Sequence, residues 1–288
     1  MKSIKELENL ESTYQNMQII IESYEEIAAN RMRRVKKSVL QNRDFLMGLN
    51  TIYRRVVYTY NKHAKRDQRH KDGRLLDILH TNGKTVSVLL SSNTSLYGAI
   101  VKKTFDYFME NILRTTSDIV IIGRLGKSMY DNYGYDRPYK YFELSDSGLT
   151  SDKLDPILSE LLEYTHIALY HGIFRSVLTQ DSTRTLITGD IVNLPSEEAR
   201  SKELDCIIEP SVEEVAEFFE KQILASLFEH ATYESSLSKF ASRMVSLDVA
   251  NDNIERLTKE TKFKLLKQRH KEANAAQQNT LSSLSLWR

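Results

Sequence analysis

Neither end of the chain contains glycine or proline, the two residues that most oppose an α-helix. All 10 glycines lie between Gly48 and Gly189, and all 4 prolines lie between Pro138 and Pro210. Helices can therefore run unbroken through both ends, whereas the turns that a sheet needs are confined to the middle. This distribution predicts two long helical arms around a mixed central region.

The C-terminal arm carries an apolar repeat at spacings of three and four residues. Its inward positions are Leu237, Phe240, Met244, Leu247, Asn251, Ile254, Thr258, Thr261, Leu265 and Gln268. This pattern is typical of one helix of a coiled coil, and it predicts a seam through Met244, Leu247 and Ile254. A polar residue such as Asn251 within a seam can fix the register of the helices; the alternative is an exposed asparagine on a slightly rotated helix.

The N-terminal arm has a matching repeat. Its positions are Leu7, Leu10, Tyr14, Met17, Ile21, Tyr24, Ala28, Arg31 and Val35. We assign Leu10, Met17, Ile21 and Ala28 to the seam. A helix of about 45 residues is roughly 70 Å long, which favours a shaft or a coiled coil. An amphipathic helix lying on the central region is the alternative.

Composition limits the possible functions. The chain has 40 Lys+Arg and 39 Asp+Glu, and a net charge of +1 does not by itself indicate a nucleic-acid-binding protein. A single cysteine, Cys206, cannot form an internal disulfide, which favours a reducing compartment. We expect no signal peptide in residues 1–6, and the aliphatic run at 119–122 is too short to cross a bilayer. A soluble or peripheral protein is expected.

The central region alternates short apolar runs with helical patterns. The expected strands are 86–90, 118–122, 165–170 and 186–188, and the expected helices are 105–113 and 154–164. Such alternation predicts a parallel or mostly parallel α/β sheet. A last helix begins near Ser211, with Glu214 completing a capping box. The predicted domains are 1–60, 61–209 and 210–288.

One turn resembles a phosphate-binding loop. The residues from Gly123 to Ser128 follow a strand and end in Gly-Lys-Ser, but the P-loop pattern needs a glycine where Ile121 stands. The sequence contains neither a Cys/His cluster with metal spacing nor a serine nucleophile motif. It therefore predicts no catalytic residue, no cofactor site and no metal site.

Two basic stretches remain. The cluster at 31–37 is predicted to face an acidic protein surface or solvent, with phosphate contact as the less favoured alternative. The polar bridge at 61–82 is predicted to be a solvated basic loop, with an anionic lipid or protein surface as the alternative.

Motifs spread along the chain resemble those of one known family. The family's C-terminal run S-x-x-A-x-R-M-x-x-M-x-x-A-x-D-N corresponds to Ser238, Ala241, Arg243, Met244, Leu247, Ala250, Asp252 and Asn253. Its N-terminal motifs N-x-Q-x-I and V-A-A-x-K-x-R correspond to Asn16, Gln18, Ile20, Ile27, Ala28, Ala29, Arg31 and Arg33. Its I-G-x-x-G and E-P motifs correspond to Ile122, Gly123, Gly126, Glu209 and Pro210. The chain thus resembles the γ subunits of F-type ATP synthases, and the resemblance covers nearly its whole length in the right order.

The chain departs from the family at three places. The family's K-A-R-Q run is replaced by Lys267-Gln268-Arg269-His270, and Asn274 and Ala276 stand in place of the threonine and glutamate of its I-T-x-E run. The family's S-D-R-G-L-C-G turn is replaced by Ser92-Asn93-Thr94-Ser95-Leu96-Tyr97-Gly98, without the acid, the base and the first glycine. The family's glycine- and alanine-rich tail is replaced by residues 282–288, which end in Trp287 and Arg288. The chain is therefore identified as a divergent member.

The resemblance implies a fold and a set of partners. The fold is an antiparallel coiled coil of the terminal helices with a central Rossmann-like α/β domain. The implied partners are the α and β subunits of the catalytic ring, a small ε-like subunit of the central stalk, and the membrane rotor ring. The candidate contacts to the ring are Arg31, Arg33, Arg34, Arg243, Lys267 and Arg269. A solvated helix face is the alternative for each.

The implied function is that of a non-catalytic rotor shaft, peripheral to the cytoplasmic face of a membrane, that couples ion translocation to ATP synthesis or hydrolysis. A rotor of a specialised ATPase is the first alternative. An unrelated coiled-coil adaptor and a nucleotide-binding enzyme using residues 123–128 are the others.

Overall fold

The structure is a computed structural model that describes residues 3–64, 83–145, 151–188 and 209–285. Its contacts divide the chain into two compact units. The shaft unit comprises residues 1–29 and 243–288, and the domain unit comprises residues 30–242. Most of the polar bridge at 61–82, Cys206 and the terminal Trp287 lie outside the described residues.

Two long helices supply residues to both units. α1 spans Ile4–Ala64 and α5 spans Val212–Ser285. The amide of Glu214 donates to Ser211 Oγ at 3.2 Å, which confirms the predicted helix start near Ser211. Ser3 and Glu6 form a reciprocal capping box at the start of α1, with N–O distances of 2.9 and 3.2 Å.

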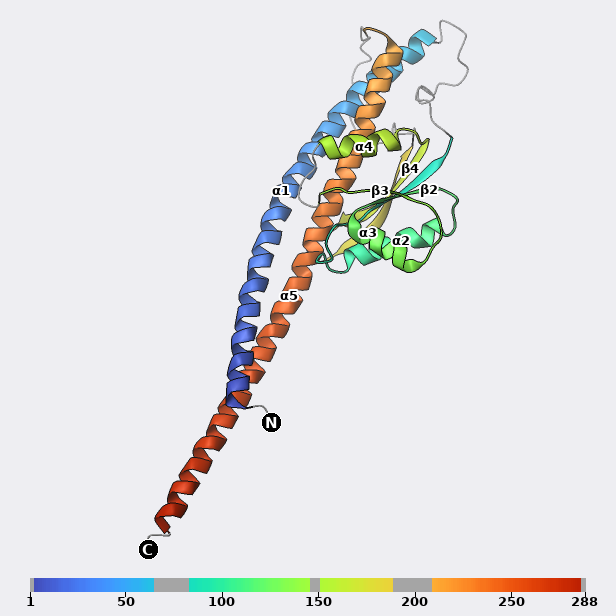
Figure 1. The fold of residues 1–288 in the computed structure, drawn as a ribbon. Coiled ribbons are helices and arrows are strands. Elements are labelled where there is room, and N and C mark those ends of the chain that lie inside the picture. Colours follow the sequence, from blue (N-terminus) through green and yellow to red (C-terminus); the bar gives the residue numbers. More distant parts are fainter. Residues whose placement is uncertain (1–2, 65–82, 146–150, 189–208, 286–288) are drawn as a thin grey trace. The chain divides into compact units, whose positions relative to one another are not determined.

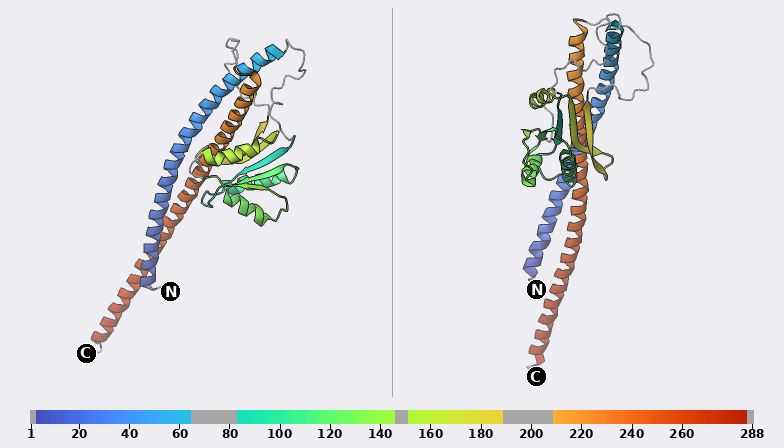
Figure 2. Two further views of the ribbon diagram at one scale, coloured as in Figure 1. Left: turned by 45° about the horizontal axis from the view of Figure 1, so that its top comes forward. Right: turned by 90° about the vertical axis from the view of Figure 1, so that its right-hand side faces the viewer.

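In the shaft unit, α1 and α5 run side by side in opposite directions (Figures 1 and 2). Arg269 Nη2 lies 2.6 Å from Glu8 Oε1, and Lys262 Nζ lies 3.8 Å from Glu11 Oε1. The residue numbers rise along one helix as they fall along the other, so the pair is antiparallel. The residues buried in this unit are Leu7, Ala28, Arg243, Thr258, Thr261 and Leu265.

The domain unit contains one five-stranded sheet. Its strands are β1 (Thr85–Leu90), β2 (Asp118–Ile122), β3 (Lys140–Phe142), β4 (His166–Phe174) and β5 (Gln180–Thr188). The order is β3-β2-β1-β4-β5, and only β5 is antiparallel to its neighbour. The predicted mostly parallel sheet is therefore confirmed. The sequence analysis missed β3, which has only three residues and no fully buried side chain.

Helices cover both faces of this sheet. One face packs against α4 (Ser151–Leu161) and the part of α5 around Phe228, and the other packs against α2 (Ile100–Ile112) and α3 (Arg124–Tyr133). Alternate residues of each strand face opposite sides, so Val88 and Val120 belong to the first layer and Leu89 and Ile121 to the second. The result is the three-layer α/β arrangement of a Rossmann-like domain.

The domain unit also contains an antiparallel stretch of α1 and α5. Asn42 Nδ2 donates to Glu229 Oε2 at 3.4 Å, and the rings of Tyr53 and Phe219 lie 6.2 Å apart. The predicted fold class, long antiparallel terminal helices with an α/β domain between them in the sequence, is therefore confirmed.

Candidate functional site

The turn that resembles a phosphate-binding loop is held by acceptors of the chain itself. α3 starts directly after Gly123, which has a φ of 104°. The amide of Arg124 donates to Asn93 Oδ1 at 3.1 Å, and the amide of Leu125 donates to the carbonyl of Ser92 at 2.8 Å. A phosphate at a helix N-terminus would need such amides for itself. The turn therefore serves to hold the loop after β1 against α3.

The two glycines of this turn allow that close approach. A Cβ at Gly123 would lie 2.9 Å from the backbone nitrogen and oxygen of Ser92, and a Cβ at Gly126 would lie 2.6 Å from Ser91 Cβ. Lys127 Nζ lies 5.1 Å from the centre of the Tyr141 ring. The Gly-Arg-Leu-Gly-Lys-Ser run is thus accounted for by packing, with its lysine over an aromatic ring.

The carboxyl edge of the sheet is where a doubly wound domain would bind a ligand. Such ligands bind where the strand order reverses, which here lies between β1 and β4. α5 occupies this crevice. Lys239 is 7% exposed, and its Nζ donates to the carbonyl of Ser91, the residue directly after β1, at 2.9 Å. Ser238 is fully buried, and a Cβ at Gly172 of β4 would lie 2.3 Å from its Oγ.

Aromatic rings extend this contact. Lys239 Nζ lies 5.8 Å from the centre of the Tyr97 ring, which meets the Phe240 ring edge-on at 5.8 Å. The guanidinium of Arg31, from α1, lies 5.9 Å from the centre of the Phe240 ring. Tyr97 is 2% exposed and Phe240 is 1% exposed, so both rings are core residues. The crevice cluster, as we call it, is formed by Ser91, Tyr97, Gly172, Ser238, Lys239 and Phe240.

A buried histidine lies beside this cluster on β4. His171 Nδ1 lies 3.1 Å from the carbonyl of Gly172 and its Nε2 lies 2.9 Å from Thr185 Oγ1. Because a carbonyl only accepts, Nδ1 carries the proton and Nε2 accepts from the threonine hydroxyl. Burial lowers the pKa of His171 to about 4; the hydrogen bond to Gly172 opposes this shift and the charge of His230 adds to it. The ring is therefore neutral at pH 7.

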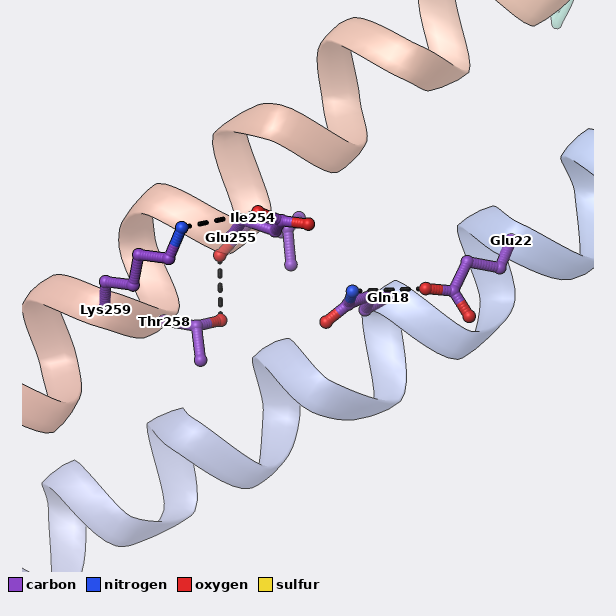
Figure 3. Close-up of polar contacts among 6 residues, drawn as sticks. All are labelled: Gln18, Glu22, Ile254, Glu255, Thr258 and Lys259. Carbon is purple, nitrogen blue, oxygen red and sulfur yellow. Dashed lines mark hydrogen bonds and ion pairs between the residues drawn. The ribbon is translucent and has the colours of Figure 1, made fainter.

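The seam of the shaft unit contains polar side chains. Gln18 points from α1 toward Ile254 and Thr258 of α5 (Figure 3). Its Nε2 donates to Glu22 Oε1 at 3.1 Å, and Thr258 Oγ1 donates to the carbonyl of Ile254 at 2.8 Å. Both of these hydrogen bonds run along a single helix, so Gln18 and Thr258 face each other across the seam without bonding to each other.

The predicted seam residues differ in exposure. Ala28 is fully buried, whereas Met17 is 47% exposed and the neighbouring Gln18 is half-buried. The others are half-buried: Leu10, Ile21, Met244, Leu247 and Ile254. Residues three or four positions apart lie on the same side of a helix, and both Met17 and Gln18 have such a spacing from Tyr14. The spacing alone therefore does not show which of the two is the less exposed. Asn251 is half-buried, and its Oδ1 is a buried acceptor without a hydrogen-bond partner among the described atoms.

Three candidate contact residues lie on α1 in the domain unit. Arg31, Arg33 and Arg34 are exposed. Arg33 Nη2 donates to Asn30 Oδ1 at 2.6 Å, and Arg31 lies over Phe240 as described above. Both guanidinium groups are therefore oriented by intramolecular contacts, while their exposure leaves them accessible to a partner.

The other three belong to the shaft unit. Arg243 is only 7% exposed, so in this structure it does not present its guanidinium at the surface. It directly precedes Met244, and this position on α5 carries its long side chain inward. Arg269 is paired with Glu8, and Lys267 is exposed. Of these three, Lys267 and Arg269 remain accessible at the surface.

Sequence reasoning missed Lys239 and Tyr97. A lysine in a long helix normally indicates a solvated face, and Tyr97 lies in a turn-like run of small polar residues. A usable signal was the run of small residues around Lys239, namely Ser235, Ser236, Ser238, Ala241 and Ser242. Small residues on all sides of a helix indicate that other backbone approaches closely, and all five are buried.

Metal sites and membrane-spanning helices are both absent from the described residues. No group of three or more His, Cys, Asp or Glu side chains in this part of the chain is placed to hold a metal ion. Among the helices that the structure describes, none is both long enough and apolar enough to cross a membrane.

The fold has counterparts among solved structures. A chain from a structure of the central stalk and c-ring of the Tetrahymena thermophila mitochondrial ATP synthase is 15% identical, with a TM-score of 0.56, and the match covers 80% of this chain and 99% of that chain. A chain of the Euglena gracilis mitochondrial ATP synthase is 12% identical, with a TM-score of 0.53, covering 89% and 94%. The fold is thus one found in subunits of ATP synthases.

Sequence comparison shows which subunit of the ATP synthases this chain is similar to. A family model described as ATP synthase matches residues 3–274. The ATP synthase gamma chain of Amoebophilus asiaticus is 25% identical over 270 residues, 90% of each chain, and that of Ruthia magnifica is 23% identical over 274 residues, 91% of this chain and 92% of that one. The chain belongs to the ATP synthase γ-chain family.

Proposed function

We propose that this γ chain is the central rotor shaft of an F-type ATP synthase, coupling ion translocation through a membrane sector to ATP synthesis or hydrolysis by rotation. The observation that carries this proposal is the family match, which extends from residue 3 to residue 274 and so includes α1, the α/β domain and α5 up to residue 274. A shaft has to bias its partners through different contacts at each angle, and this requires a stiff asymmetric rod.

The chain itself is proposed to be non-catalytic. The amides at the start of α3 are taken by Asn93 and Ser92, and Lys239 fills the crevice at the carboxyl edge of the sheet. Both places where a Rossmann-like domain would hold a nucleotide are thus occupied by the chain's own groups. In this proposal the nucleotides are bound and hydrolysed by the partner ring.

Substitution of Lys127 distinguishes the proposed rotor from the alternative function of a nucleotide-binding enzyme. Because its ammonium group lies over the Tyr141 ring, we expect Lys127→Ala to leave the ATP hydrolysis of the assembled complex unchanged. The measurement is steady-state hydrolysis by the purified complex, with ATP binding by the isolated chain as a second readout. Binding of ATP that disappears in the Lys127→Ala variant would favour the enzyme.

The proposed partners are the α and β subunits of the ring, a small ε-like stalk subunit and the membrane rotor ring. The solved structures of similar fold come from assemblies described as central stalk/c-ring and OSCP/F1/c-ring, which supports such partners in general. The proposed ring contacts are the accessible cations Arg31, Arg33, Arg34, Lys267 and Arg269. Acidic loops fit them by charge.

The proposed location is the cytoplasmic face of a membrane, where the chain is held by its partners. None of the described helices is suited to cross a bilayer, so attachment through other subunits fits this part of the chain. A rotor of a specialised ATPase that does not make ATP is the second candidate, motivated by the departures at Asn93, Thr94 and Ser95.

A gentle affinity purification of the tagged chain from its native cell tests the proposal. Mass spectrometry and an ATPase assay of the eluate are expected to show α- and β-type subunits with hydrolysing activity. The membrane subunits present distinguish a synthase from a specialised ATPase. Recovery of the chain alone, or as a homodimer without ATPase activity, would overturn the rotor and favour a coiled-coil adaptor.

A further inference from the structure

We propose that Lys239 is a positioning residue that locks the α/β domain onto α5, so that the filled ligand crevice of this domain serves as the joint through which torque passes. This inference rests on the proposed rotor function. A rotor whose domain receives force must pass it to its long helices through side-chain contacts, and the crevice cluster is where the carboxyl edge of the sheet meets α5 within the domain unit.

Lys239 brings a positive charge into the crevice. The residue is 7% exposed, and burying an ammonium group is expensive, so a position that served packing alone would be better filled by leucine or methionine. Here the ammonium donates to the carbonyl of Ser91 and lies over the Tyr97 ring. A charged hydrogen bond to the end of β1 has a direction, and it therefore fixes the angle of α5 in a way that apolar contacts do not.

The contact between β4 and α5 is sterically tight. Gly172 has no room for even a Cβ, which would lie 2.3 Å from Ser238 Oγ and 3.0 Å from Ile100 Cγ1. Because neighbouring residues of a helix point about 100° apart, α5 would have to turn and advance together to bring Leu237 or Lys239 to the position of Ser238. Neither side chain fits there, so the small serine and the glycine oppose this screw movement of α5.

Both long helices take part in this joint. Phe240, next to Lys239, meets the Tyr97 ring edge-on, and the guanidinium of Arg31 of α1 lies over the Phe240 ring. Met32 and Val35 of α1 pack against the hydrophobic cluster that contains both rings. Force that reaches the loop after β1 is thus shared between α1 and α5.

The test replaces Lys239 in the intact complex. Lys239→Met keeps the length and removes the directional bond, Lys239→Arg keeps a donor and a cation over the ring, and Lys221→Met removes an exposed lysine of α5 as the matched control. ATP hydrolysis and ATP-driven ion pumping are measured on the same membrane vesicles. Losing one charged hydrogen bond shifts the equilibrium toward a released α5 by about tenfold or more, so we expect Lys239→Met to lower the number of ions pumped per ATP hydrolysed.

The remaining variants should separate positioning from folding. Lys239→Arg is expected to recover most of the pumping ratio, and Lys221→Met to match the wild type. A normal ratio in an assembled Lys239→Met complex would overturn the proposal, as would an arginine variant no better than the methionine variant. If the complex with Lys239→Met does not assemble, Tyr97→Leu takes its place, because it removes the ring under the ammonium group. A normal pumping ratio in the Tyr97→Leu complex would also overturn the proposal. If the complex with the wild-type chain shows no pumping, the rotor function itself fails.

Discussion

At the scale of single residues, His171 gives the domain unit a pH-dependent stability. Burial lowers the pKa of this imidazole to about 4 in the folded chain, below its ordinary value of 6.5. The unfolded chain therefore binds the proton more readily, so stability is complete above pH 6.5 and falls as the pH drops toward 4. The full effect is roughly 3 kcal/mol.

The comparison that isolates this effect uses His171→Gln. Glu229 and Glu234 have pKa values raised by burial, so they act in the opposite direction in the same range and blur the wild-type curve alone. We expect the wild type to lose stability relative to His171→Gln between pH 6.5 and 4, measured by denaturant unfolding. His166→Gln, on an exposed residue of the same strand, should follow the wild type. Parallel curves for all three proteins would contradict the prediction.

Local sequence motifs predicted some of the contacts that individual residues make, but not the contacts between residues far apart in the sequence. Ser211 and Glu214 were assigned as a capping box because this motif acts through neighbours three residues apart. The contacts of Lys239 with Ser91 and of Asn93 with Arg124 join residues far apart in the sequence. No local pattern specifies such pairs, so they became visible only once the strands and helices had been placed.

At the scale of elements, the contact of β4 with α5 depends on Gly172. Gly172→Ala is expected to destabilise the chain by about 1–3 kcal/mol, because the new Cβ would overlap Ser238 Oγ. Adding Ser238→Ala should restore part of this loss, because the remaining Ser238 Cβ is 3.3 Å away whereas the tight contact with Ile100 Cγ1 at 3.0 Å stays. Thermal unfolding of the two single variants and the double variant gives the coupling between them.

Gly48→Ala is the matched control for that series. Gly48 lies in α1, and nothing lies within 4 Å of the position that a Cβ would take there, so only the helix propensity changes. We expect this variant to be more stable than the wild type by roughly 0.5–1 kcal/mol. Equal loss of stability in Gly48→Ala and Gly172→Ala would mean that close packing of β4 on α5 is not the cause.

The polar end of the shaft-unit seam is a second test at this scale. Leu265 is 5% exposed, whereas its neighbour Leu266 is 54% exposed. Leu265→Ala should cost about 2–3 kcal/mol and Leu266→Ala less than about 0.5 kcal/mol, measured by chemical denaturation. Because the residue type, the helix and the substitution are the same, the difference reports burial alone. A similar cost at both positions would show that α5 is rotated from the placement described.

The elements themselves were largely predictable. A short apolar run such as 118–122 indicates a buried strand, and a long repeat such as that of α5 indicates one face of a helix. All ten inward positions expected on α5 are buried or half-buried. β3 was missed because three residues are too short for a period. On α1 the prediction placed Met17 in the seam, but Gln18 is the less exposed of the two residues. Because both positions lie near the same side of the helix, only the placement of the partner helix decides which of them is covered.

At the scale of the whole molecule, the chain combines two long helices with a Rossmann-like domain whose crevice at the carboxyl edge of the sheet is filled by Lys239 of α5. Asn93 Nδ2 donates to the carbonyl of Leu144 at 2.8 Å, and its Oδ1 accepts from the amide of Arg124. This residue therefore joins the loop after β1 both to the start of α3 and to the segment after β3. The proposed rotor shaft requires such fixed geometry rather than a free binding site.

The end of α5 tests whether the rotor needs more than a stable fold. Stopping the chain after Lys267 removes a stretch in which every side chain described from Arg269 to Ser283 is exposed. The main stabilising interaction that this truncation removes is the Arg269–Glu8 ion pair, which is about half exposed and contributes roughly 0–1 kcal/mol. We expect nearly wild-type unfolding but a reduced ratio of ions pumped to ATP hydrolysed. Arg269→Ala in the full-length chain controls for the ion pair, and normal coupling in the shortened chain would show that this end of α5 does not contribute to coupling.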